Sequence, residues 1–245
     1  MNIHLYAAAA AAVLVACAAA PASAGTGHVD IAYLALEGDQ YVQGLQASGA
    51  YAAPVGDWSF SIDGVVASLK DNPTNGDDFY SGTANIGRAG MTGYYGAYVS
   101  LGSTFDTDVQ EAGVLLQGYY TKWTATARAG IGSIDLTNND STIGGAVGLT
   151  YYPTENVAVG VTASMLQISH RPDAYTTRLD VEWQPKITPF SIFAGESWHD
   201  NDYGTSRRVM SVGVRYNFGA MSLKARDQSG GNLGTGNFAD NAFAR

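Results

Sequence analysis

The stretch RRVMSVGVRYNF (residues 207–218) decides the fold class of this 245-residue chain, because two kinds of side chain alternate along it. The even positions from 210 onward are apolar: Met210, Val212, Val214, Tyr216 and Phe218. The odd positions from 211 onward are small or polar: Ser211, Gly213, Arg215 and Asn217. Successive side chains of a β-strand point to opposite faces of its sheet, so the stretch predicts a strand with one apolar and one polar face. The fold then depends on which of these faces meets the solvent.

About twelve segments of roughly ten residues share this period of two. They lie near residues 28–36, 41–52, 58–67, 79–88, 92–102, 109–120, 123–132, 142–152, 157–167, 174–184, 190–198 and 208–218. The connections alternate between short turns, such as residues 153–156, and longer segments rich in Asp and Asn, such as residues 71–78 and 199–206. Tight turns at one end and longer polar loops at the other predict an up-and-down meander.

Three features indicate that the apolar faces point outward into lipid. Charged residues make up only 14% of the chain, against about 25% in soluble domains, so the polar faces consist mainly of Gly, Ser, Thr and Ala. Segments of about ten residues match a tilted strand that crosses the hydrocarbon layer. Aromatic residues gather on the apolar faces near the short turns, as in an interfacial girdle: Tyr51, Trp58, Tyr120, Trp123, Tyr151, Trp183, Tyr216 and Phe218.

The fold class predicted over residues 25–218 is therefore all-β, a closed antiparallel up-and-down transmembrane β-barrel of about 12 strands. In lipid every backbone N–H and C=O needs a partner within the protein, so the sheet has to close on itself. An even number of strands places both ends of the barrel on one side, together with the short turns, which we expect in the periplasm. A soluble secreted β-sandwich or lipocalin would alternate in the same way, but the shortage of Lys and Glu on the polar faces disfavours it.

The termini are expected to lie outside the barrel. Residues 1–24 predict a secretory signal peptide, with an Ala-rich apolar core and the cleavage sequence Ala22-Ser23-Ala24, although they contain no Lys or Arg. A second interpretation stays open, because LVAC (residues 14–17) resembles a lipobox in which Cys17, the only cysteine, would be lipidated. Residues 219–245 are polar and rich in Gly and Asn, which predicts a mostly disordered periplasmic tail, with residues 222–227 as the part that could be held against the barrel.

These features together resemble the porin-like branch of the Gram-negative outer-membrane β-barrel superfamily. The resemblance rests on the signal segment, the alternating strands and the final strand VMSVGVRYNF (residues 209–218), which is similar to the aromatic-ended signal recognised by the barrel-assembly machinery. The sequence departs from that pattern because a tail follows Phe218. The resemblance implies residence in the cell outer membrane, contact with outer-membrane lipid and the assembly machinery, and small hydrophilic solutes as partners. It leaves the solute and the oligomeric state open.

Charged residues on the polar faces are the candidate site. They are the candidate pore-lining residues: Asp30, Asp63, Glu111, Arg128, Arg178, Asp180, Glu182 and Arg215. Such charges line a water-filled pore and set its ion preference, or they pair into a network that fills a narrow barrel. Acids and bases nearly balance, so we expect weak ion selectivity. The two functions that follow are passive diffusion of small hydrophilic solutes and, alternatively, a structural or surface-interaction barrel with a plugged lumen.

Enzymatic and cofactor chemistry is not expected. None of His28, His170 and His199 begins the His-x-Ser pattern of lipid-hydrolysing barrels. An acidic and histidine-containing group on external loops, made of Asp77, Asp78, His199 and Asp200, could imitate the site of a barrel protease, but such loops are usually only solvated. The Asp-rich loops show no calcium-binding spacing, and no phosphate-binding glycine motif precedes a helix. The net charge of −9 also disfavours nucleic-acid binding.

Overall fold

The computed structural model describes residues 25–37, 42–72, 75–104, 107–135, 140–202 and 206–233, without the side chains of residues 70–78 and 104. Twelve strands make up most of this part of the chain. Their bounds are β1 (Thr26–Glu37), β2 (Val42–Val55), β3 (Trp58–Asn72), β4 (Asn75–Gly90), β5 (Gly93–Thr104), β6 (Thr107–Tyr119), β7 (Trp123–Asp135), β8 (Asp140–Thr154), β9 (Val157–Ile168), β10 (Ala174–Trp183), β11 (Phe190–Asn201) and β12 (Ser206–Phe218). Two short helical segments follow, α2 (Leu223–Arg226) and η1 (Asp227–Gly231). No helix in these ranges is long and apolar enough to cross a membrane.

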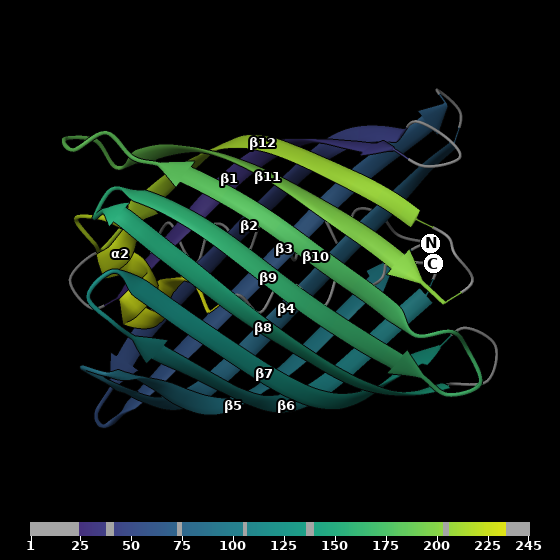
Figure 1. The fold of residues 1–245 in the computed structure, drawn as a ribbon, viewed down its shortest axis with the longest axis horizontal. Helices are drawn as coiled ribbons and strands as arrows, with labels where there is room; N and C mark the ends of the chain where they lie inside the picture. Colours follow the sequence, from purple (N-terminus) through teal and green to yellow (C-terminus); the bar gives the residue numbers. More distant parts are fainter. Residues whose placement is uncertain are drawn as a thin grey trace.

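The strands form one closed barrel in which each pairs with its neighbours in the sequence, and β1 pairs with β12 to close it. All of these pairs are antiparallel, as expected for an up-and-down meander. Figure 1 shows the strands tilted against the long axis of the barrel. The closing ladder sets Asp30 opposite Arg215 and Tyr33 opposite Val212. The predicted fold class, a closed barrel of about 12 strands, is confirmed.

The outer surface of the barrel is apolar. Val212, on the strand that opened the sequence analysis, is 57% exposed, and its neighbour Ser211 faces the inner cavity. The other strands repeat this arrangement with exposed apolar residues on their outer faces: Ile31, Leu45, Ile62, Ile86, Val99, Val114, Ile131, Val147, Val161, Leu179, Val181 and Ile192. A continuous apolar surface of this kind is stable in lipid and unfavourable in water. The barrel is therefore a membrane barrel, with its apolar face outside.

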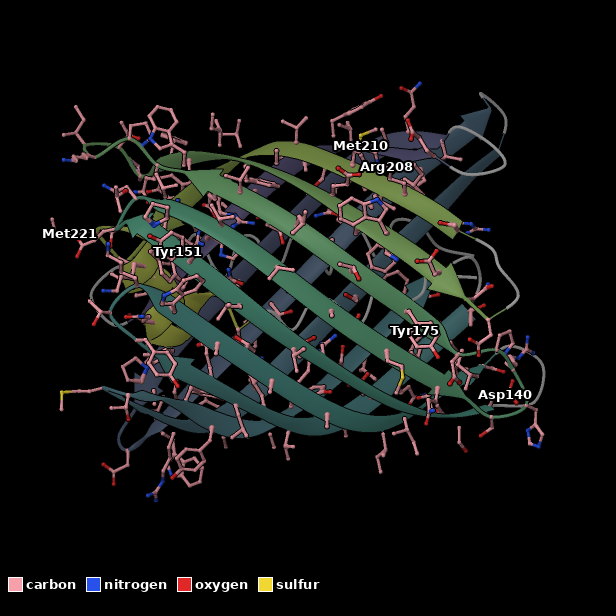
Figure 2. The ribbon with its side chains drawn as sticks, in the orientation of Figure 1. Asp140, Tyr151, Tyr175, Arg208, Met210 and Met221 are labelled. Carbon is pink, nitrogen blue, oxygen red and sulfur yellow. The ribbon has the colours of Figure 1, made fainter. Side chains whose placement is uncertain are left out.

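Aromatic residues border this apolar surface at the end of the short turns. Trp123 lies 4.4 Å from Tyr151 between ring centroids, and Phe190 lies 5.3 Å from Tyr216. In Figure 2, Tyr151 lies near this end, as does Met221, whereas Tyr175 and Asp140 lie toward the opposite end. We call these the short-turn end and the loop end.

An outward-facing charged group borders the apolar surface near the loop end. Arg208 of β12 pairs with Glu196 of β11 and lies 3.5 Å from Glu37 of β1. Figure 2 shows Arg208 and Met210 on the outer wall. The group joins three neighbouring strands on both sides of the closing seam. The apolar part of the outer wall therefore ends before the strands reach the loop end.

The strands at the loop end are longer than the sequence predicted. β3 has 15 residues and β4 has 16, so together they contain nearly all of the segment 71–78 that was expected to be a loop. Likewise β11 extends to Asn201 and includes His199. The prediction of long loops at these places was wrong, because a backbone ladder that is already paired can continue with Asp and Asn side chains once it leaves the membrane.

The chain turns back into the barrel directly after β12. Gly219 has a φ of +73°, and a Cβ atom there would lie 1.9 Å from the carbonyl oxygen of Gly25. Only glycine fits this close approach. The side chain of Ser222 then accepts a hydrogen bond from the Ala225 amide and begins α2. Figure 1 shows α2 within the short-turn end of the barrel.

Candidate functional site

The inner surface of the barrel holds the candidate site, and the strand registers place all eight predicted residues on it. The best connected are Asp30, Glu182 and Arg215. The Arg215 guanidinium donates from Nε to Asp30 Oδ2 at 2.9 Å and from Nη1 to Glu182 Oε2 at 2.7 Å. Asp30 Oδ1 also accepts from the Ser48 hydroxyl, and Nε2 of the His28 ring lies 3.5 Å from Asp30 Oδ2, the oxygen that Arg215 contacts. Three strands, β1, β10 and β12, thus contribute to one buried ionic network.

The remaining predicted residues form smaller groups. Arg178 donates from Nε to Asp180 Oδ1 at 2.7 Å, and both side chains keep about a third of their surface exposed, at 30% and 37%. Asp63 accepts from Asn85 at 3.5 Å. Glu111 accepts from the Tyr98 hydroxyl, and Arg128 is buried. The eight charges therefore do not converge on one centre.

A polar cavity of about 270 Å³ lies among these residues. Six of the eight predicted residues line it: Asp63, Arg128, Arg178, Asp180, Glu182 and Arg215. Glycines 148, 160 and 195 contribute further lining on the inner faces of β8, β9 and β11. Small residues at these positions leave room that larger side chains would fill. The cavity can hold water and small polar molecules.

The sequence analysis missed the inward-facing tyrosines. Tyr94, Tyr98 and Tyr152 are almost completely buried on the inner faces of β5 and β8. The Tyr98 side chain of β5 lies across β6 and reaches β7, where a Cβ atom on Gly130 would be 2.5 Å from its hydroxyl. Alternation along β5 could have predicted two of them, because Tyr94 and Tyr98 are separated by an even number of residues from the inward-facing Ser100. They narrow the lumen toward the short-turn end.

The largest group missed by the sequence analysis comes from the C-terminal tail. Arg226 is 1% exposed and binds Glu182 through two hydrogen bonds of 2.9 and 3.1 Å. Its guanidinium also donates to Asn217 Oδ1 at 2.6 Å and to Asp227 Oδ1 at 2.8 Å. Asp227 in turn accepts from the Tyr152 hydroxyl at 2.9 Å. The buried network thus extends from the barrel wall into the tail.

The environments of Arg226 and Asp227 act on their protonation in different ways. Burial alone would lower the pKa of Arg226, but the charges of Asp227 and Glu182 outweigh it and raise the pKa, which keeps the guanidinium charged. Burial raises the pKa of Asp227, against the opposing effect of Arg226. Two arginines, Arg215 and Arg226, therefore face three acids, which are Asp30, Glu182 and Asp227.

Two inner-face residues resemble a nucleophile and its base. Ser197 Oγ lies 2.8 Å from His199 Nε2, and Thr176 Oγ1 lies 3.1 Å from Nδ1 of the same ring. The order along the strand is the reverse of the His-x-Ser pattern considered above. His199 is fully buried, and the neighbouring strands β10 and β12 pair across this part of β11. His199 lies inside the barrel, so it does not belong to the group on external loops that was considered above, and the side chains of Asp77 and Asp78 lie outside the described residues.

No metal site is present in the described ranges, where no three His, Cys, Asp or Glu side chains are grouped to hold an ion.

Solved structures share the fold at low sequence identity. An outer-membrane channel from Pseudomonas putida F1 matches with a TM-score of 0.60 and 9% identity, over 82% of this chain and 97% of that one. The NanC porin matches with a TM-score of 0.59 and 10% identity, over 77% and 98%. The KdgM porin, solved in complex with disordered oligogalacturonate, matches with a TM-score of 0.54 and 12% identity, over 77% and 99%. No protein-family model and no curated protein sequence matches. The likeness shows the barrel fold of outer-membrane porins and channels.

Proposed function

We propose that this protein is a porin-like channel of the Gram-negative outer membrane, which lets small hydrophilic solutes diffuse passively along its lumen. The observation that supports it best is the polar cavity of about 270 Å³ enclosed by a barrel whose outer surface is apolar. Such a cavity replaces hydrocarbon by a polar path. The porins and the channel that share the fold support the same class of function.

The remaining features of the proposal concern biogenesis and orientation. Residues 1–24 act as a signal peptide, and β12 is the strand that the assembly machinery recognises. The short turns and residues 219–233, at the short-turn end of the barrel, lie on the periplasmic side, and the loop end faces outward. Neither the solute nor the number of subunits follows from this arrangement.

The lumenal charges support weak ion selectivity. Arg215 and Arg226 are both paired with acids, and Arg178 pairs with Asp180. Paired charges present little net field to a passing ion. The eight predicted residues therefore serve as the polar lining of the path, with the Asp30–Arg215–Glu182 network also stabilising the wall.

The proposed activity involves no covalent chemistry. The contact between Ser197 and His199 lies within a β-ladder, where the strand amides donate to the neighbouring strands. Such amides cannot supply the oxyanion-binding donors that acyl transfer needs. A buried hydroxyl–imidazole contact in this place stabilises the wall.

Narrowing the cavity tests the path. Gly160 lines the cavity, and a Cβ atom added to it would have no neighbour closer than 3.7 Å, whereas the adjacent Val161 faces outward. Gly160→Trp should lower the open-channel conductance in planar bilayers about two-fold or more, because an indole would fill the passage. Val161→Trp is the matched control and should leave conductance unchanged. Equal conductance in the two variants would contradict a path through the cavity.

The alternative, a structural barrel with a plugged lumen, is favoured by one observation. The described part of the tail occupies the short-turn end of the lumen, where Arg226 and Asp227 line the cavity. A permanent plug would leave the barrel impermeable, whereas a movable plug would regulate it.

A further inference from the structure

Residues 222–233 are attached to the barrel wall from several directions. Leu223 is completely buried against Tyr152 and Ala158 of β8 and β9. At the other end of the segment, Leu233 packs in a cluster with Tyr94, Tyr98 and Leu115 of β5 and β6. Between these two ends, η1 contacts β1, β2 and β3, which lie across the closed barrel from β8 and β9, so the segment crosses the lumen.

Polar contacts attach the middle of the segment to further strands. The His28 ring of β1 donates from Nδ1 to the Gly231 carbonyl at 3.2 Å. Gln117 of β6 donates to the Asn232 carbonyl at 3.4 Å, and Gln228 donates to the Tyr120 carbonyl at 3.2 Å. Together with Arg226, these contacts reach strands around most of the barrel. The segment is therefore a plug across the lumen and not a tail resting on its rim.

The segment separates two cavities. Its residues Arg226, Asp227, Asn232 and Leu233 line the inner cavity of about 270 Å³. On the other side, Ser229 and Gly219 line a cavity of about 700 Å³ at the short-turn mouth. The two cavities have no lining residue in common. The segment therefore lies between the inner cavity and the short-turn mouth.

Apolar packing of Leu223 and Leu233 and several single hydrogen bonds hold the segment, and one polar contact is stronger than the others. Arg226 makes a two-pronged ion pair with Glu182 while fully enclosed by protein. Such paired hydrogen bonds between guanidinium and carboxylate are strong and directional. Loss of Arg226 removes the ion-pair partner of the buried Asp227 and leaves Glu182 with Arg215 alone, which destabilises the plugged arrangement.

We propose that residues 222–233 form a movable plug that closes the periplasmic end of the lumen, and that the Arg226–Glu182 pair is its latch. This inference rests on the proposed function, because a plug regulates only a barrel that conducts. In the latched state the inner cavity is closed at the short-turn end. Solutes pass when the latch opens and the segment leaves the short-turn end.

The first test breaks the latch in the full-length protein. Arg226→Met removes the charge and keeps an apolar side chain of similar length, so the plugged state loses its main attachment. The open probability in planar bilayers should rise about tenfold or more, with uptake of small sugars into proteoliposomes rising in parallel. Lys224→Met is the matched control, since it removes the same charge from the same short helix, and Lys224 contacts the wall through its backbone amide. It should behave as the wild type. Folding of each variant is checked by heat-modifiable electrophoretic migration.

The second test locks the plug. A Cβ atom built on Gly230 lies 3.5 Å from the Cβ of Ala52 on β2, which suits a disulfide. Gly230→Cys with Ala52→Cys, in a Cys17→Ser background, should abolish conductance when oxidised and recover it under reductant. Gly230 has a φ of +82°, a left-handed conformation that disfavours cysteine. The oxidised variant is therefore compared with its own reduced form, which contains the same substitution.

The outcomes separate the two proposals. If Arg226→Met equals the wild type and the oxidised cross-link leaves conduction unchanged, the plug is overturned and the channel stands. If the folded wild type, Arg226→Met and the reduced double cysteine variant are all impermeable, the channel fails and the plug with it. If oxidation of the double cysteine variant stops conduction reversibly, and Arg226→Met raises the open probability whereas Lys224→Met does not, both proposals stand.

Discussion

Replacing Val212 with Arg should destabilise the folded barrel by about 2–4 kcal/mol in a lipid bilayer. Val212 lies near the middle of β12 with its side chain exposed on the outer wall, opposite Tyr33 and Ala194 on the neighbouring strands. An arginine there would have to bury its guanidinium in hydrocarbon or bend toward the interface. The quantity to measure is the free energy of unfolding in urea, followed by tryptophan fluorescence in phospholipid vesicles.

Ser211→Arg is the matched control for Val212→Arg, because the two residues are adjacent and face opposite sides of the wall. Ser211 lines the polar cavity, so an arginine there can extend into water and should cost less than about 1 kcal/mol. The difference between the two variants reports the orientation of the wall directly. Equal costs at both positions would contradict an apolar outer surface in contact with lipid.

Strand parity made most of the wall predictable from the sequence. The period of two along residues 208–218 continues in all of the other strands, and backbone pairing in lipid requires the sheet to close. The position of Asp30 and Arg215 on the inner face therefore followed from the alternation of side chains. Which charges would pair did not follow. The contact between Arg215 and Glu182 depends on registers across β10, β11 and β12, and these are set by turn lengths that alternation does not specify.

The tail and the loop end were harder to predict, for a different reason in each case. Residues 219–233 are polar and glycine-rich without a period, so the sequence indicated only that residues 222–227 could be held against the barrel and not that they enter the lumen, although Ser222 before Leu223 is a recognisable helix start. Their position depends on contacts with a lumen that exists only once the barrel has closed.

At the loop end, His199 has the same parity as Ser197, and this alternation could have placed it inside the wall. Its acidic neighbours led to the incorrect assignment as a loop.

Arg215→Met should be the most destabilising change within the lumen, at about 3–5 kcal/mol, because it breaks a buried ionic network by removing one partner. The Asp30 side chain has no exposed surface, and Arg215 is the cation that bonds to it at 2.9 Å. After the substitution Asp30 would keep Ser48 and the nearby His28 ring, and Glu182 would keep Arg226. The measurement is again unfolding in urea.

Arg178→Met provides the comparison for Arg215→Met, since it removes the same side chain from the same surface of the lumen. Arg178 and Asp180 are each about a third exposed to the cavity, so water can solvate Asp180 when its partner is lost. The expected cost is therefore below about 1 kcal/mol. If the two substitutions cost the same free energy of unfolding, then burial does not distinguish the network around Arg215 from the pair of Arg178 with Asp180. In that case the stabilising role given to Asp30, Glu182 and Arg215 would be wrong, because solvation by lumenal water would reach both groups equally.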